Sequence, residues 1–250
     1  MEICIDRTTG NYLLNEQGVP MTPAEIEKII PRHLKPQQTK KERSKSKAEV
    51  YTPSWLCNEM NNQLDKEWFG RDNVFNVTHN KSWTATPKLV FSKNWQDYVR
   101  LNVLEITCGE GAFLTSVYDT TTGATIEIPN RIGILDRKLR VVCENTHTKA
   151  GWLEWAKEAY KHTYGYEYQA DSLIICRRNL LQTFIDYYEY KFNSKPNKDE
   201  VDTILDIITW NVIQMDGLKY TIPHTDIYAK TKNWAKDEII RFVDIVDASG

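Results

Sequence analysis

The chain has 250 residues, and 32 lysines and arginines stand against 34 aspartates and glutamates, which gives a formal net charge of -2. The hydrophobic fraction of 41% and the charged fraction of 26% are ordinary for a globular protein and exclude a disordered chain. The balanced charge offers no bulk electrostatic argument for nucleic acid binding, so such an argument has to come from local basic patches.

Five cysteines are scattered along the chain without the Cys-x-x-Cys spacing of a zinc site, so no metal site is expected. Their odd number and the absence of a secretory signal predict reduced thiols in a cytoplasmic protein. No apolar stretch approaches the length of about 18 residues that a membrane-spanning helix needs. A membrane partner is therefore not expected.

The first 47 residues are expected to form an N-terminal extension. Residues 1–18 alternate in polarity around the turn Asp-Arg-Thr-Thr-Gly, which predicts a β-hairpin. A helix is predicted to follow, with Thr22 as N-cap, Pro23 in its first position and Glu25 completing a capping box.

The segment from Arg32 to Lys47 is rich in lysine and arginine and contains one acid, Glu42. Its composition is typical of a solvated, mobile linker. The alternative interpretation is a basic arm that contacts DNA phosphates. The residues assigned to DNA contact in that case are Lys40, Lys41, Arg43, Lys45 and Lys47.

Residues 48–250 are expected to form one α/β domain with insertions at about 65–100 and 115–163. A helix is predicted after Pro53, with Leu56, Met60 and Leu64 on one apolar face. The run Val103–Leu114 contains two glycines between apolar segments, which indicates a strand that turns sharply into a helix. The turn Asp119–Gly123 repeats the pattern of the first hairpin and predicts another.

The remaining elements alternate between helix and strand. Helical periodicity covers residues 132–142 and 151–161, and a short strand then ends at Glu167. Helices follow from Asp171 and over 198–208, a strand over 209–217 contains Asp216, and a last strand is expected over 239–246. This alternation predicts a parallel sheet, in which ligands bind beyond the carboxyl ends of the strands.

Acidic residues stand at the ends of three of these strands, at Glu105, Glu167 and Asp216. A carboxylate after the second strand can accept from two ribose hydroxyls, and one after the third can accept from an exocyclic amine. This pattern suits an adenosyl ligand. The glycines lie much farther from Glu167 than the roughly 20 residues usual in dinucleotide folds, so residues 115–163 are expected to loop out.

These segments resemble the S-adenosylmethionine-dependent N6-adenine DNA methyltransferases of restriction–modification systems. Residues 49–56 (Glu-Val-Tyr-Thr-Pro-Ser-Trp-Leu) resemble the family's segment before the cofactor turn. Residues 104–114 resemble the turn itself, although Ile106-Thr107 replaces the usual Pro-Ala and Glu105 the usual Asp. Residues 164–167 with 176–181, and residues 214–218, resemble the ribose-binding and adenine-contacting segments.

The resemblance implies a Rossmann-like methyltransferase sheet that binds S-adenosylmethionine and acts on double-stranded DNA. Glu105 and the backbone around Gly109 and Gly111 would hold the methionine part, Glu167 the ribose hydroxyls and Asp216 the adenine N6. The full set of implied cofactor contacts is Tyr51, Thr52, Pro53, Glu105, Thr107, Cys108, Gly109, Gly111, Glu167, Tyr168, Asp216 and Gly217.

The family's catalytic motif, Asn/Asp-Pro-Pro-Tyr/Phe, has no counterpart, because the sequence contains no Pro-Pro pair. Phe242–Val246 resembles the strand before that motif, and Asp247 could imitate only its first residue. Catalytic residues are therefore unassigned. The sheet is expected to be incomplete at its C-terminal end, and a partner chain or a C-terminal region would supply the rest.

Three alternatives remain open. The chain could be a catalytically inactive cofactor- or DNA-binding subunit of a restriction or defence system. It could be an α/β protein whose acids only cap helices and whose glycines only form turns. A nuclease is suggested by Glu189 and Lys191, but no matching Pro-Asp precedes them.

Overall fold

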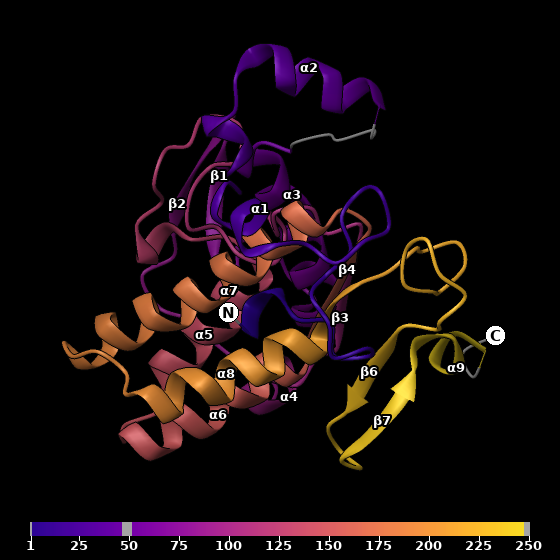
Figure 1. Cartoon of the computed structure of the whole chain (residues 1–250). Helices are drawn as coiled ribbons and strands as arrows, with labels where there is room; N and C mark the ends of the chain where they lie inside the picture. The colour runs from indigo at the N-terminus through magenta and orange to yellow at the C-terminus, as the bar shows by residue number, and fades with distance from the viewer. Residues whose placement is uncertain (1, 47–51, 248–250) are drawn as a thin grey trace.

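A three-stranded parallel sheet is the centre of the fold. The computed structural model describes residues 2–46 and 52–247 (Figure 1). Strands β3 (Val103–Ile106), β4 (Thr163–Glu167) and β5 (Val212–Gln214) pair in the order β3-β4-β5. Both pairs are parallel, as the alternation of strand and helix predicts, so the three carboxyl ends lie at one edge.

Four long helices connect these strands and lie together on one side of the sheet (Figure 1). Helices α5 (Ile134–Asn145) and α6 (Lys149–Lys161) join β3 to β4, and α7 (Ala170–Phe192) and α8 (Lys198–Asn211) join β4 to β5. Their apolar faces form the main core, which includes Trp152, Leu173, Phe184, Tyr188 and Ile207. The sequence predicted each of these helices because their periodicity is strong.

The N-terminal extension contains the 3-10 helices η1 (Glu2–Cys4) and η2 (Arg32–Leu34) and the helices α1 (Pro23–Glu27) and α2 (Gln37–Ser46). The predicted capping box of α1 is confirmed. Glu25 Oε2 accepts the Thr22 N–H at 2.6 Å, and the Thr22 hydroxyl accepts the Glu25 N–H at 3.3 Å. This pairing satisfies two N–H groups that the start of a helix leaves unpaired.

The two Asp-x-Thr-Thr-Gly turns have the same structure. In each turn the aspartate accepts two following N–H groups at 2.8–3.0 Å, and the glycine has a positive φ of 73° or 77°. One antiparallel bridge flanks each turn, Ile5↔Tyr12 and Tyr118↔Thr125. The turns are therefore as predicted, but the expected hairpin strands are reduced to single bridges.

Helix α3 (Ser54–Phe69) begins after Pro53 as predicted, but the apolar face of Met60 and Leu64 is not the buried face. Met60 and Leu64 are 48% and 47% exposed, whereas Asn58, Asn61 and Asp65 are buried. The polar face turns inward because it contacts the buried guanidinium of α5.

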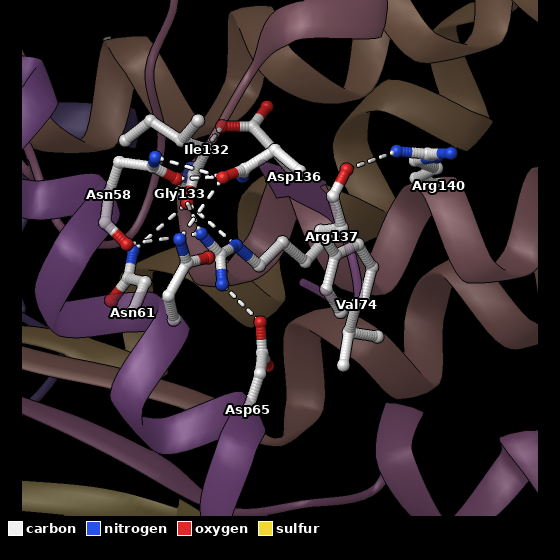
Figure 2. Close-up of polar contacts among 12 residues, drawn as sticks. Asn58, Asn61, Asp65, Val74, Ile132, Gly133, Asp136, Arg137 and Arg140 are labelled. Carbon is white, nitrogen blue, oxygen red and sulfur yellow. Dashed lines mark hydrogen bonds and ion pairs between the residues drawn. The ribbon is translucent and has the colours of Figure 1, made fainter. Parts of the chain in front are cut away.

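That guanidinium belongs to Arg137, which is fully buried between α3 and α5 (Figure 2). It forms an ion pair with Asp65, donates to Asn58 Oδ1 at 2.8 Å and donates to the Ile132 carbonyl at 3.0 Å. Tyr98 completes the network by donating to Asp65 at 2.7 Å. Burial is favourable here only because every charge has a partner.

The expected insertion at about 65–100 begins within α3 and contains regular structure. It contains the hairpin of β1 (Asn76–His79) and β2 (Ser82–Ala85) and the short helix α4 (Trp95–Val99).

The C-terminal part differs from the predicted strands. Residues 209–211 belong to α8, so β5 begins only at Val212. The expected last strand over 239–246 divides into β7 (Glu238–Arg241) and the helix α9 (Phe242–Asp247). Strand β7 pairs with β6 (Lys230–Asn233) in a separate antiparallel ribbon. Phe242–Val246 is therefore helical and does not add a strand to the parallel sheet.

Replacing Asp65 with Asn should lower the free energy of unfolding by about 3–5 kcal/mol, because it leaves the Arg137 charge buried and uncompensated. Urea unfolding followed by tryptophan fluorescence measures the change. Asp72→Asn is the matched control, since Asp72 also pairs with a cation but both side chains are mostly exposed and the expected cost is below about 1 kcal/mol. Equal losses in the two variants would contradict this account.

Candidate ligand site at the carboxyl edge of the sheet

The segment after β3 is a strained turn. Thr107, Gly109 and Gly111 have positive φ angles of 54°, 55° and 86°. A threonine in this region is uncommon and costs free energy, and such residues cluster at functional sites. A Cβ added to Gly109 would meet nothing within 4 Å, so this glycine faces open space.

The predicted helix after this turn is not present. Residues 111–114 form a single turn, and the next α-helix begins only at Ile134. The carbonyls of Phe113 and Leu114 accept the N–H groups of Ile134 and Leu135, each at 2.9 Å. The start of α5 therefore occupies acceptors that a helix from residue 111 would use, so no helix dipole begins at the glycine turn.

Glu167 joins the end of β4 to the glycine turn. Its Oε2 accepts the Gly109 N–H at 2.9 Å, across 58 residues of sequence, and its Oε1 accepts the Gln169 N–H at 2.9 Å. Burial raises the pKa of this carboxyl, although the hydrogen bonds oppose the shift. Because each carboxylate oxygen has two lone pairs, both can still accept from a ligand hydroxyl. The residues between the two motifs do not simply loop out, because α5 and α6 lie among them and pack in the main core.

Glu105 is a half-buried carboxyl near the Cys57 thiol. Burial is the main cause that raises the pKa of this thiol, and the Glu105 charge adds to it. Burial raises the pKa of Glu105 itself to about 7. Within the described residues it has no hydrogen-bond or ion-pair partner. A carboxylate in this position would be stabilised by a cationic group of a ligand.

Cys108 and Gly111 pack tightly against α7. A Cβ on Gly111 would lie 2.8 Å from Cys176 Sγ, so only glycine fits there. The hydrogen bond with Cys176 and burial together raise the pKa of the Cys108 thiol well above its ordinary value. The Cys108 thiol is therefore an unreactive packing group.

Glu110 is a structural residue of this turn that sequence reasoning did not single out. It is buried and accepts the Arg32 N–H at 2.7 Å and the Tyr118 hydroxyl at 3.0 Å. The N-terminal extension is thus bonded directly to the glycine turn.

Asp216 and Gly217 follow β5 at the same edge of the sheet. Asp216 Oδ1 accepts the Leu218 N–H at 2.9 Å, so the carboxylate shapes its own turn. Gly217 lies against the ring of Tyr166, where a Cβ would be only 2.7 Å away. The backbone places Asp216 beside Glu167, because the Met215 N–H donates to the Glu167 carbonyl at 3.1 Å.

The segment before α3 lies close to the turn at residues 119–123. Thr52 accepts from the Thr120 hydroxyl at 3.1 Å, Pro53 caps α3, and the Ser54 N–H donates to Asp119 at 2.8 Å. None of these hydrogen bonds involves the glycine turn. Tyr51 lies outside the described residues.

Tyr168 follows Glu167 and is 37% exposed. Its hydroxyl lies 3.4 Å from His224 Nε2, on the loop that follows Asp216.

The basic segment is a helix, not a mobile linker, within its described part. Arg43 pairs with Asp171 at 3.0 Å, and Lys40 donates to the His33 carbonyl at 3.0 Å, so two of the predicted DNA contacts have intramolecular partners. Lys41 and Lys45 are exposed and have no such partner among the described residues. Lys47 lies outside them.

A cavity of about 380 Å³ lies between the N-terminal extension and the start of α7, and Glu167 is not among its lining residues. Tyr168, Gln169 and Asp171 line one side of it, and Leu14 and Met21 line the other. The Gln214 side chain fixes the extension here, because it accepts the Leu14 N–H at 2.8 Å and donates to the Leu14 carbonyl at 2.7 Å. No local sequence signal indicated that the extension is bonded to Gln214 of β5.

No family model, curated protein or solved structure matches the chain. In the described parts of the chain, no helix is long and apolar enough to cross a membrane. All five cysteines are free.

Glu105→Gln should stabilise the protein at alkaline pH. The folded-state pKa of about 7 lies above the ordinary value of 4.5, so the wild type loses stability as pH rises from 4.5 through 7, whereas glutamine does not titrate. At pH 8 the variant should unfold with a free energy higher by on the order of 1–3 kcal/mol.

Urea unfolding at pH 4 and pH 8 measures this difference. Glu154→Gln, at an exposed position of α6, is the control. Its free energy of unfolding should differ from that of the wild type by the same amount at both pH values. A Glu105→Gln effect that is the same at both pH values would contradict the assigned environment.

Proposed function

We propose that this chain binds S-adenosylmethionine at the carboxyl edge of its parallel sheet, as the cofactor-binding part of an adenine-specific DNA methyltransferase. The observation that carries the proposal is the hydrogen bond between Glu167 and the Gly109 N–H. It brings the strained turn and the acid of the next strand together, which is the arrangement in which an α/β sheet holds a nucleoside.

The acids at this edge favour a ligand with cationic and hydroxyl groups over a phosphate. Glu105 suits the ammonium or sulfonium of the methionine part, since its carboxyl is half-buried and has no partner among the described residues. Glu167 has lone pairs left for two ribose hydroxyls. Asp216, half-buried at the end of β5, suits an exocyclic amine. Bound S-adenosylmethionine would supply an electrophilic methyl group.

DNA is proposed as the partner, because Lys41 and Lys45 are cations of α2 that have no intramolecular partner among the described residues. The reaction proposed by resemblance is methyl transfer to adenine N6 in double-stranded DNA. Such enzymes act on a base that has left the stack, and they need groups that orient it. The sequence has no Pro-Pro motif to do so. A cofactor-binding subunit without turnover of its own is therefore the form of the proposal that fits this chain.

Isothermal titration calorimetry with S-adenosylmethionine tests the ligand. We expect saturable binding by the wild type and a loss of at least about tenfold in affinity for Glu167→Gln, since a charged hydrogen-bond acceptor contributes about 1.5–3 kcal/mol. Glu154→Gln should bind like the wild type. Circular dichroism should show both variants folded.

The absence of heat from the folded wild type at millimolar ligand would contradict the proposal. So would equal affinities of the wild type and Glu167→Gln.

This chain alone should transfer no methyl group to DNA. The reason is that nothing in its sequence provides the motif that orients the adenine. Incubation with tritiated S-adenosylmethionine and adenine-containing duplex should leave the DNA unlabelled, while a known adenine methyltransferase labels it in parallel. Formation of N6-methyladenine by the purified chain would contradict this expectation.

A further inference from the structure

The two outer strands of the parallel sheet differ in how they are covered. All three residues of β5 are buried, and the Gln214 side chain bonds the N-terminal extension to this strand. Strand β3 pairs only with β4 among the described residues, and along it partly buried and exposed residues alternate. Leu104 and Ile106 are 46% and 59% exposed. Strand β3 is therefore an open edge of the sheet, and its exposed side chains are apolar.

The backbone of β3 has hydrogen-bonding groups that β4 does not use. The Val103 N–H donates to the His162 carbonyl at 3.1 Å, so Val103 faces β4. The next residue, Leu104, therefore directs its N–H and carbonyl toward the open side. Proteins that keep such an edge free usually protect it with lysine, proline or a bulge, but β3 (Val-Leu-Glu-Ile) contains neither lysine nor proline. The open edge is suited to pairing with a strand of another chain.

Two grooves flank this open edge. The first has a volume of about 470 Å³ and lies between β3 and α3, where Leu64 and Trp68 line it. The second has a volume of about 330 Å³ and lies between β3 and the C-terminal elements β7 and α9, where Ile240 and Ile245 line it. Residues 102–104 line both grooves, so β3 forms a ridge between them. A partner that pairs with β3 would cover both grooves.

The charge and the size of this surface suit a second copy of the chain. Among the residues that line the grooves, Asp65 and Lys138 are buried with hydrogen-bond partners, and Lys232 pairs with Asp237 at 2.6 Å. Glu67 is the remaining charged lining residue, so the surface has little charge to repel its own copy. One groove is lined by 11 residues and the other by 10, with three shared. This number approaches the roughly 20–30 residues that each partner contributes to a standard interface.

We propose that two copies of this chain form a dimer in which their β3 strands pair antiparallel across a twofold axis at Leu104. A twofold axis makes the interface self-complementary, because each copy contributes the same strand and the same grooves. With Leu104 opposite Leu104 of the second copy, Val103 lies opposite Glu105 of the second copy. A register centred on Glu105 is less favourable, because it places two like charges directly opposite each other. The two parallel sheets join into one, and this inference does not depend on the proposed ligand.

Analytical ultracentrifugation of the purified full chain measures the oligomeric state. The wild type should sediment as a dimer at about 10 μM. Leu104→Lys should weaken dimerisation at least about tenfold, because it places like charges opposite each other in an apolar interface. Val90→Lys is the matched control and should dimerise as the wild type does, since Val90 is 64% exposed but lines neither groove. A folded wild type that stays monomeric at about 100 μM overturns the proposal, as does a dimer that Leu104→Lys leaves intact.

Cysteine crosslinking tests the register of the two strands. Opposite residues of a hydrogen-bonded antiparallel pair have Cα atoms about 5.5 Å apart, which a disulfide can span. Under mild oxidation Leu104→Cys should therefore give a disulfide-linked dimer on a non-reducing gel. Ile106→Cys is more exposed but lies two positions from the axis in each copy, so it should stay uncrosslinked, as should the wild type. Crosslinking of Ile106→Cys, or a dimer in which Leu104→Cys does not crosslink, overturns the proposed pairing.

Discussion

The buried guanidinium of Arg137 is the constraint on which the other elements depend. A charge with no access to water is tolerated only when its partners are fixed, and here they come from α3 and from the segment before α5. Asn61 of the same α3 face donates to the carbonyls of Phe113 and Ile132, at 3.1 Å and 3.0 Å. The loop between the glycine turn and α5 is thus held at both ends.

The contacts of Arg137 and Asn61 explain how the long connection between β3 and β4 still brings the ends of these two strands together. The chain from the glycine turn to β4 passes through a loop and two helices, yet it returns Glu167 to within 2.9 Å of the Gly109 N–H. The N-terminal extension adds contacts from the outside, through the Arg32 N–H to Glu110 and through Leu14 to Gln214. Glu105, Glu167 and Asp216 thus come to this one edge of the sheet.

Features that depend on neighbouring residues could be predicted from the sequence. The Thr22–Glu25 capping box, the two Asp-x-Thr-Thr-Gly turns and the parallel strands ending near Glu105 and Glu167 follow from local hydrogen bonding and from periodicity. Features that depend on distant partners could not. The inward face of α3 is set by Arg137, and the turn after Gly111 lacks a helix because α5 occupies its carbonyls.

The same distinction applies to the basic segment and to the last predicted strand. Composition alone predicted a linker or a DNA-binding arm for residues 32–47. In the structure, Lys35 and Arg43 pair with Asp171, which lies far along the chain, and residues 37–46 form the helix α2. Phe242–Val246 has the apolar residues of a strand, yet Phe242 packs its ring against Tyr166 and the segment is helical. Short apolar runs do not distinguish strand from helix.

The most direct test of the central claim is the backbone amide resonance of Gly109 during a titration with S-adenosylmethionine. A ligand on Glu167 must perturb the N–H that donates to that carboxylate, so a saturable shift at Gly109 is predicted, with amides around the Arg137 network unchanged. Saturable shifts that leave Gly109 and Gln169 unaffected, or no shifts at all, would contradict a ligand site at this edge of the sheet.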